Sequence, residues 1–380
     1  MRAVLILLLG WAVLIGPAAA RAAETVFDTT ARAAIMIDAR TGAVLYEKNP
    51  DEPLPPASMS KLMTAFMVFE RLKEGSLKMT DELPVSERAW RTGGSKMFVE
   101  VGKTVSVSDL LRGMIIQSGN DACVVLAEAI AGSEKAFAQL MTERARELGM
   151  TNSHFANANG LPDPEHYMSV RDLATLARHI IEDFPEYYGI YAEEEYTFNG
   201  IRQFSRNPLL RAGVPGVDGL KTGHTQEAGY GLVASAKRGE RRLILVMAGL
   251  KTDRLRAQES RVLLEHGFRD FQEYMLFREG APVADAAVWM GAAPSVKLGV
   301  ARDMALTLSR EARKGLSARL VFDAPVRAPV AAGQVVGRAI ATVGDAPAQE
   351  IPLVALEPVA EAGLIGRAAA VLGQLIGGGS

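Results

Sequence analysis

The arrangement of strand-like and helix-like segments restricts the fold of this chain most. Strand patterns flank a glycine turn near its beginning, at 34–37 and 43–46, and strand patterns return at 230–236 and 241–250. Helix patterns fill the chain between them, at about 58–73, 108–116, 122–131 and 136–148. Because the early and the late strands must bury their apolar faces, we predict that they join in one antiparallel sheet covered by the helices.

The chain after about residue 277 has a different character. Short apolar runs separated by Gly, Pro and charged residues lie near Val288, Val300, Leu306, Leu320, Val335, Ile340 and Leu353. This spacing is typical of a small all-β domain. The length of 380 residues also favours two domains. We therefore predict an α/β (α+β) domain over 24–277, followed by a β-rich domain over 278–357.

The N-terminus has the layout of a secretory signal peptide. A basic Met1-Arg2 precedes an apolar run from Ala3 to Ile15, and small residues follow at 18–23. An uncleaved membrane anchor is the alternative, but the apolar run is shorter than the ~20 residues that a spanning helix needs. We expect residues 1–23 to direct export and cleavage to occur between Ala20 and Ala23.

Charge and residue counts exclude several classes of function. The net charge is -2 and the basic clusters are short, which argues against nucleic acid as a partner. The single cysteine, Cys123, permits no intramolecular disulfide and fits a buried structural thiol. No histidine lies three to five residues from another and HExxH is absent, so we expect neither a metal site nor a cofactor.

The segment Ser58-Met59-Ser60-Lys61 opens the helix pattern at 58–73. Three residues apart on a helix, Ser58 and Lys61 share one face. A lysine that is partly desolvated loses its proton near neutral pH and can act as a general base for the serine hydroxyl. A helix-capping serine followed by a surface lysine is the alternative reading of this short pattern.

Two further short motifs follow. Ser118-Gly119-Asn120 lies between two helix patterns, where we expect Gly119 to let the chain turn sharply and direct both flanking side chains into one cleft. Lys221-Thr222-Gly223, followed by His224, fits a strand edge that supplies a hydroxyl, a positive charge and close access to the backbone. Alone, the first of these is simply a turn.

The order of the three motifs is far more specific than any one of them. SxxK, SxN and KTG, in this order, form the set found in class A β-lactamases and penicillin-binding proteins. From about Ala33 to its C-terminus the chain resembles the low-molecular-mass penicillin-binding proteins that act as D-alanyl-D-alanine carboxypeptidases. The likeness extends to the segments Gln117–Cys123, Asn199–Gln203 and Asp218–Thr225.

The resemblance implies a β-lactamase/transpeptidase-like catalytic domain and a role for each motif residue. Ser58 would attack the carbonyl between two D-alanines, Lys61 would accept its proton, and Ser118 would assist protonation of the leaving group. The remaining residues would bind substrate: Asn120, Lys221, Thr222, Gly223, His224, Arg206 and Arg256. The oxyanion would lie between the backbone N–H groups of Ser58 and His224, and the two arginines would face the terminal carboxylate.

The resemblance also implies partners and a location. The substrates would be peptidoglycan stem peptides ending in D-Ala-D-Ala, and β-lactam antibiotics would be covalent inhibitors. The apolar face of residues 358–380 resembles the amphipathic tail that attaches family members to the outer face of the inner membrane, in the periplasm. A helix docked on its own protein is the alternative. One departure is Asn159-Gly160-Leu161, where close relatives often have His before Gly-Leu.

Three other functions stay open. A β-lactamase would share the fold, but the E-x-x-L-N segment of class A enzymes is absent between the second and third motifs. A D-alanyl-D-alanine endopeptidase that cuts cross-links differs from a carboxypeptidase only in access to the pocket. A catalytically inactive module that binds wall peptides is the third alternative, and the intact motifs speak against it.

Overall fold

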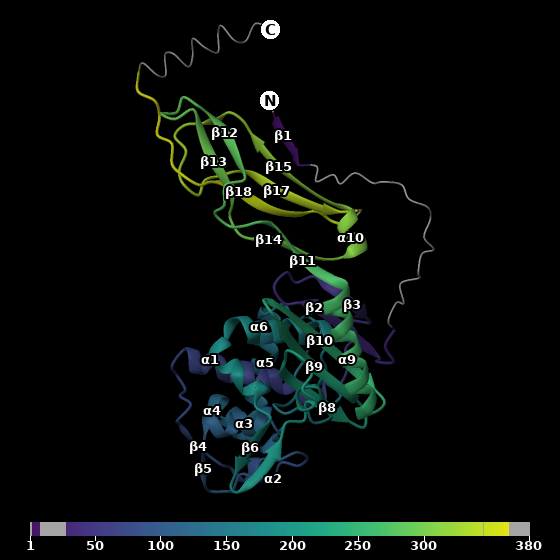
Figure 1. Cartoon of the computed structure of the whole chain (residues 1–380). Coiled ribbons are helices and arrows are strands. Elements are labelled where there is room, and N and C mark those ends of the chain that lie inside the picture. Colours follow the sequence, from purple (N-terminus) through teal and green to yellow (C-terminus); the bar gives the residue numbers. More distant parts are fainter. Residues whose placement is uncertain (1, 8–27, 345, 365–380) are drawn as a thin grey trace, which may run out of the picture. The chain divides into compact units, whose positions relative to one another are not determined.

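The computed structural model describes residues 2–7, 28–344 and 346–364, and Figure 1 shows the course of the chain. The expected signal peptide and tail therefore lie largely outside the described residues. The chain divides after Arg269 into two compact units. We call residues 28–269 the mixed unit, and β1 (Arg2–Leu7) with the residues from Asp270 onward the β unit.

The mixed unit contains short strands, a long antiparallel sheet and many helices. Its strands are β2 (Ala33–Asp38), β3 (Val44–Lys48), β4 (Glu82–Pro84), β5 (Thr104–Ser106), β6 (Glu195–Phe198), β7 (Ile201–Phe204), β8 (Val217–Thr225), β9 (Gly229–Arg238) and β10 (Arg241–Leu250). Its helices are η1 (Ala57–Ser60), α1 (Lys61–Lys73), α2 (Glu87–Arg91), α3 (Val107–Ile115), α4 (Asn120–Ala131), α5 (Glu134–Glu147), α6 (Val170–Asp183), α7 (Pro185–Tyr188), η2 (Gly189–Ala192), α8 (Pro208–Arg211) and α9 (Asp253–Asp270).

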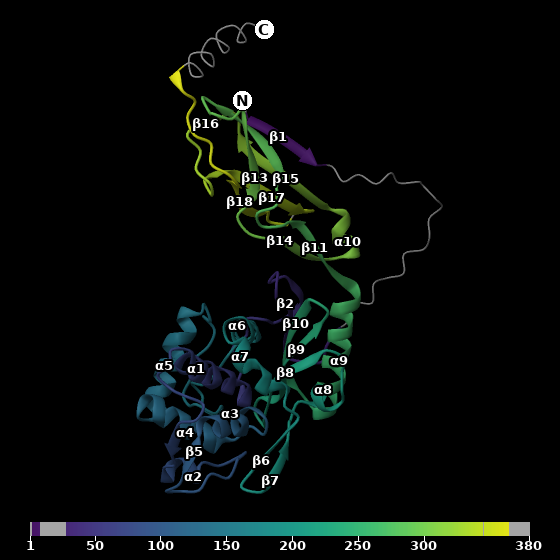
Figure 2. The same ribbon diagram turned by 60° about the vertical axis from the view of Figure 1, so that its left-hand side comes forward.

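The main sheet unites strands from both ends of the mixed unit. Its order is β3-β2-β10-β9-β8, and β2 pairs antiparallel with β10 so that Ile37 faces Ile244. Helix α9 lies on one side of this sheet and α1, α5 and α6 lie on the other, as both Figure 1 and Figure 2 show. This arrangement confirms the predicted antiparallel sheet covered by helices.

Helix α1 forms the centre of the helical layer. Its side chains Leu62, Met63, Phe66 and Phe69 are fully buried, and the helix packs against α3, α4, α5 and α6. A helix that is apolar on most of its circumference is stable only when other elements surround it. The predicted helix at 58–73 therefore exists, but its first turn, η1, is a 3₁₀ helix rather than an α-helix.

Capping serines start several of the helices. Hydroxyl oxygens accept a backbone N–H at the N-terminus of α2, α3, α5 and α6, from Ser86, Ser106, Ser133 and Ser169 respectively. Helix α1 has no such cap, because it continues directly from η1. The side chain of Ser58 is therefore not consumed as a helix cap.

The β unit is built around an apolar core from strands that pair antiparallel, except for β12 and β16, which pair parallel. Its strands are β1, β11 (Phe271–Phe277), β12 (Ala284–Trp289), β13 (Ser295–Val300), β14 (Met304–Ser309), β15 (Leu316–Asp323), β16 (Val326–Arg327), β17 (Val335–Val343) and β18 (Gln349–Ala355), with the short helix α10 (Arg310–Lys314). The larger sheet has the order β1-β15-β17-β18-β13-β12-β16. Leu298, Leu320 and Leu353 are completely buried between the strands. The prediction of a β-rich C-terminal domain is confirmed.

Within residues 2–7, 28–344 and 346–364, no helix combines the length and the apolar character needed to cross a bilayer.

Candidate active site

Ser58 and Lys61 meet at the junction of η1 and α1. The Nζ of Lys61 lies 2.8 Å from the Oγ of Ser58, to which it donates a hydrogen bond. The preceding residue, Ala57, has a left-handed backbone with φ 48°. A residue with a Cβ rarely adopts this conformation, so the surrounding chain must hold the turn in place.

Two glycines allow that support. A Cβ at Gly160 would lie 1.9 Å from the carbonyl oxygen of Ala57, and a Cβ at Gly223 would lie 2.7 Å from that of Pro56. Glycine is therefore required at both positions, because any side chain would collide with the backbone of the turn. The close approach that Gly223 permits is first of all an approach of the chain's own backbone.

Lys61 is buried, with 1% of its surface exposed. Its Nζ also donates a hydrogen bond to the backbone carbonyl of Asn159. Burial is the main reason why the pKa of Lys61 is lowered to about 8, and the charge of Arg206 lowers it further while Asp121 opposes both. A substantial fraction of this amine is neutral near pH 8, so it can accept a proton from Ser58.

The second motif lies directly before α4. Ser118, not Gly119, has the left-handed backbone of this turn, with φ 73°. Gly119 has φ -57° and is needed for space, since a Cβ there would lie 2.9 Å from Oδ1 of Asp121. Among the described residues, the buried hydroxyl of Ser118 has no hydrogen-bond partner. It is therefore available to a substrate or to a proton in transit.

Asn120 and Asp121 connect α4 to the loop at 93–99. The Nδ2 of Asn120 donates to the carbonyl of Gly93 at 2.8 Å. The carboxylate of Asp121 accepts the backbone N–H groups of Met97 and Phe98, each at 2.9 Å. Sequence reasoning did not select Asp121, and only its position directly after the SxN motif indicated it.

The third motif lies on β8. Lys221 is buried, and its Nζ donates to the carbonyl of Thr222 at 3.2 Å. Its pKa is well below the usual value, first because of burial and then because of the charges of Lys61 and Arg206. Thr222 is also buried, whereas the exposed ring of His224 stacks on Tyr230 at a centroid distance of 3.9 Å.

The two predicted arginines lie beside these motifs. Arg206 follows β7, and its Nη1 donates to the Oγ of Ser95 at 2.7 Å. Arg256, on α9, is 7% exposed and forms an ion pair with Asp253. Its charge also lowers the pKa of Lys221. The structure thus brings both guanidinium groups within electrostatic range of the buried lysines, although each already has a partner.

Sequence reasoning also missed a buried histidine behind the nucleophile turn. The Nε2 of His166 lies 2.8 Å from the Oγ of Ser60. Burial lowers the pKa of His166 to about 4, so the ring is neutral at neutral pH. His166 lies 106 residues after Ser60 in the chain, so no local sequence pattern predicted their contact.

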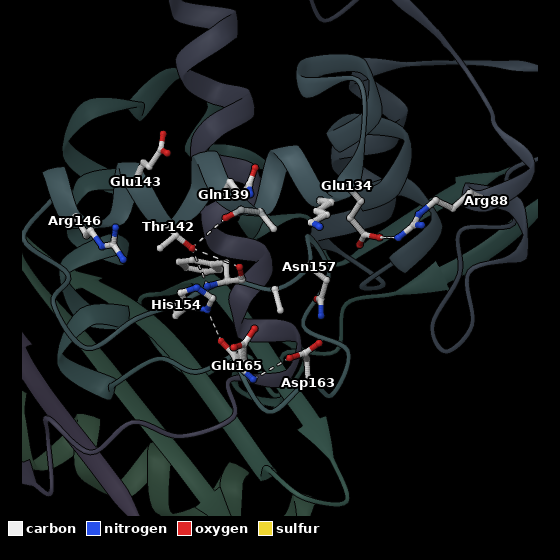
Figure 3. A pocket seen from close by; sticks show the side chains of 14 residues that line it. Arg88, Glu134, Gln139, Thr142, Glu143, Arg146, His154, Asn157, Asp163 and Glu165 are labelled. Atoms are coloured by element: carbon white, nitrogen blue, oxygen red, sulfur yellow. Dashed lines mark hydrogen bonds and ion pairs between the residues drawn. The ribbon is translucent and has the colours of Figure 1, made fainter.

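The mixed unit has two open cavities. One cavity of about 520 Å³ includes His224, Thr225 and Tyr230 in its wall. The other, of about 740 Å³, lies between α5 and the loop at 154–165 (Figure 3). In the described part of the chain, no group of three or more His, Cys, Asp or Glu residues is arranged to hold a metal ion.

Comparison with known families identifies both units. Residues 18–252 match the family described as D-alanyl-D-alanine carboxypeptidase. Residues 271–361 match the family described as penicillin-binding protein 5, C-terminal domain.

Individual relatives agree with the family matches. The chain is 43% identical to the D-alanyl-D-alanine carboxypeptidase DacC of Escherichia coli over 363 residues, which are 93% of this chain and 91% of DacC. The structure resembles that of penicillin-binding protein 5 from Haemophilus influenzae with a TM-score of 0.80 and 39% identity, covering 88% and 98% of the two chains. A Listeria monocytogenes penicillin-binding protein in its ampicillin-bound form has a TM-score of 0.59 and 33% identity, covering 64% and 99%.

Proposed function

The chain belongs to the D-alanyl-D-alanine carboxypeptidase family, and from this premise we propose that it removes the terminal D-alanine from peptidoglycan stem pentapeptides through an acyl-enzyme on Ser58. The hydrogen bond of 2.8 Å between Ser58 and the buried Lys61 is the observation that carries the proposal. A serine beside a lysine of lowered pKa is an activated nucleophile.

The first step is acylation. Neutral Lys61 accepts the proton of the Ser58 hydroxyl while the Oγ attacks the carbonyl carbon between the two D-alanines. A C–O bond forms and the carbonyl oxygen becomes an oxyanion, which the backbone N–H groups of Ser58 and His224 stabilise. One such donor typically contributes about 10²–10³ in rate.

The second step releases D-alanine. The proton on Lys61 passes through the Ser118 hydroxyl to the leaving nitrogen, and the C–N bond breaks. The Ser118 Oγ, buried and without a partner among the described residues, supports this relay. Water then attacks the ester carbonyl while Lys61 accepts one of its protons. The ester C–O bond breaks, Lys61 returns the proton to the Oγ of Ser58, and the shortened peptide leaves as a carboxylic acid.

The remaining residues bind the substrate. Asn120 and the β8 residues Lys221, Thr222 and Gly223 hold the peptide backbone, while Arg206 and Arg256 attract the terminal carboxylate. The supporting observation is electrostatic: both arginines lower the pKa of Lys221 and therefore lie near it. A cluster of cations in a buried setting favours an anionic group.

β-Lactam antibiotics are the second class of ligand in the proposal. We propose that β-lactams acylate Ser58, because a relative with 33% identity has been solved in its ampicillin-bound form. We also propose export by residues 1–23, domains at 24–277 and 278–357, and attachment of 358–380 to the periplasmic face of the inner membrane. N-terminal sequencing of the exported protein checks the cleavage site. Fractionation of cells that produce a variant without residues 358–380 checks the membrane attachment.

Intact mass measured over time, with a penicillin added to the wild type and to Ser58→Ala, tests the nucleophile. We expect a lasting one-to-one adduct on the wild type alone, and loss of D-alanine release by about 10⁴-fold or more in Ser58→Ala. No adduct on either protein would contradict the mechanism. A short-lived adduct with rapid drug hydrolysis would instead identify a β-lactamase.

The same preparation distinguishes the two peptidase activities. A soluble pentapeptide and a cross-linked dimer, supplied at equal concentration, are followed by chromatography of the products. Release of D-alanine from the pentapeptide with an intact dimer supports the carboxypeptidase, and cleavage of the dimer supports the endopeptidase.

A further inference from the structure

We propose that Glu134 is a positioning residue for Lys61, acting through the loop at 157–160. The proposal rests on the role of Lys61 as the general base. It concerns a carboxylate on α5 that none of the three motifs includes. The argument follows hydrogen bonds from α5 to the loop and from the loop to Lys61.

Glu134 is a buried acid whose carboxylate accepts hydrogen bonds from the loop and from one arginine. Its Oε1 accepts the Nδ2 of Asn159 and the backbone N–H of Ala158, each at 3.2 Å. Its Oε2 accepts the Nη2 of Arg88 at 2.6 Å, the contact drawn between these residues in Figure 3. Because a carboxylate is a strong acceptor, the two loop donors that it holds fix the position of the loop, while Arg88 fixes the carboxylate.

The carbonyl groups of the same two residues point to α1. The carbonyl of Asn159 accepts the Nζ of Lys61, and that of Ala158 accepts the Oγ of Thr64 at 2.6 Å. A peptide unit is planar, so a bond that fixes the N–H of Ala158 also restricts the neighbouring peptide planes. Glu134 thus determines where the Asn159 carbonyl lies and, through it, where the amine of Lys61 lies.

The burial of a charged acid at this place has a physical explanation. Only 8% of the Glu134 side chain is exposed, but it is the first residue of α5, where the helix dipole favours a negative charge. Arg88, 65% exposed, supplies the opposite charge from the solvent side. Truncation of Glu134 would leave the buried donors of Ala158 and Asn159 unpaired.

The expected effect on Lys61 has two parts. Asp121, Cys123, His166, Arg206 and Lys221 are titratable or charged groups that interact with Lys61, and the Asn159 carbonyl is its backbone acceptor. A hydrogen-bond acceptor favours the ammonium form, so displacement of the acceptor lowers the pKa of Lys61. The acid limb of the pH–rate profile, in which the acylation rate rises as Lys61 loses its proton, then moves to lower pH. At the same time the amine is less well placed, so the maximum rate falls.

The test is the pH profile, from about pH 5 to 10, of the second-order rate of acylation by a penicillin. For Glu134→Ala we expect a maximum rate about 10- to 100-fold lower and an acid limb at lower pH. Glu134→Gln keeps an oxygen acceptor for both donors, and we expect it to restore most of the rate and the wild-type limb. Glu143→Gln, an exposed carboxylate on the same helix and in the same cavity wall, is the matched control and should behave as the wild type.

The outcomes separate the possible failures. A wild-type rate and limb in Glu134→Ala would overturn the inference, and so would a Glu134→Gln variant as impaired as Glu134→Ala. If Glu134→Ala does not fold, Asn159→Ala removes one of the two loop contacts and should move the limb in the same direction by less. Absence of any adduct on the wild type would instead overturn the proposed function itself.

Discussion

The mixed unit and the β unit bury different kinds of side chain. Among the described residues, every buried lysine, arginine, aspartate and glutamate lies in the mixed unit, including Lys61, Lys221, Asp121, Glu134 and Arg256. The core of the β unit is apolar. Burial of a charge without full compensation costs several kcal/mol. The mixed unit therefore accepts a loss of stability that the β unit avoids.

The backbone of the two cores differs in a related way. In the mixed unit, Ala57, directly before the first motif, and Ser118, in the second motif, are both left-handed, which costs about 1–2 kcal/mol for each residue with a Cβ. The apolar core of the β unit follows the ordinary alternation of strands instead, as in β13, where Val296 and Leu298 are buried and Lys297 is exposed. Packing alone explains the core of the β unit, whereas the buried charges and left-handed residues of the mixed unit need a further, functional reason.

Truncation in the apolar core should have the largest effect and should leave the chemistry alone. For Leu353→Ala we expect the β unit to lose about 2–5 kcal/mol of unfolding free energy, because a cavity replaces a completely buried side chain. The acylation rate should stay within about twofold of wild type. Urea unfolding and penicillin acylation measure the two quantities.

Val335→Ala, in the same unit but 61% exposed, is the control and should change neither quantity. A parallel fall in acylation and stability in Leu353→Ala would break the comparison, since it would make the β unit part of the catalytic machinery.

Removal of a buried charge from the mixed unit should show the opposite pattern. For Lys221→Met we expect acylation to fall by about 10²-fold, while stability rises by about 1–3 kcal/mol. The gain follows because a buried amine beside other cations is replaced by an apolar chain of similar length. Thermal unfolding and intact mass measure the two effects.

The matched control is Lys237→Met on the exposed end of β9. A Lys221→Met protein that is both less active and less stable would mean that the buried amine stabilises the fold, contrary to the comparison.

The smallest effect concerns pH. In the proposed mechanism acylation requires neutral Lys61, so its rate should rise with pH through about 8. Arg206 lowers the pKa of Lys61, so Arg206→Gln should raise that pKa and move the limb to higher pH, by roughly half a unit. Arg202→Gln, an exposed arginine on β7, should leave the limb in place. A limb that moves to lower pH in Arg206→Gln would show that this charge does not act on Lys61 directly.

Much of this fold could be predicted because its signals are local. The hairpin of β2 and β3, the strands β9 and β10 and helix α1 each follow from periodicity in one short segment. Their union in one sheet followed from the need to bury two sets of apolar strands. The spacing of Ser58 and Lys61 gave their contact, since three residues span one helical turn.

The remainder depends on pairs that are distant in the chain. Arg88 and Glu134 are 46 residues apart, and Glu134 and Asn159 are 25 apart, so no local pattern joins them. The reason for the glycine at 119 is also not local. Glycine is the usual residue for a left-handed turn, but here close packing against Asp121 and Met97 requires the glycine, and Ser118 adopts the turn.

The burial of Lys61 and Lys221 places two opposed selection pressures on the gene. Substitutions that remove either amine would yield a more stable protein with much lower activity. Directed evolution for heat resistance alone would therefore favour the loss of these lysines, unless each generation is also screened for turnover. A single codon change is enough to produce such a variant, with higher thermal stability and much lower activity.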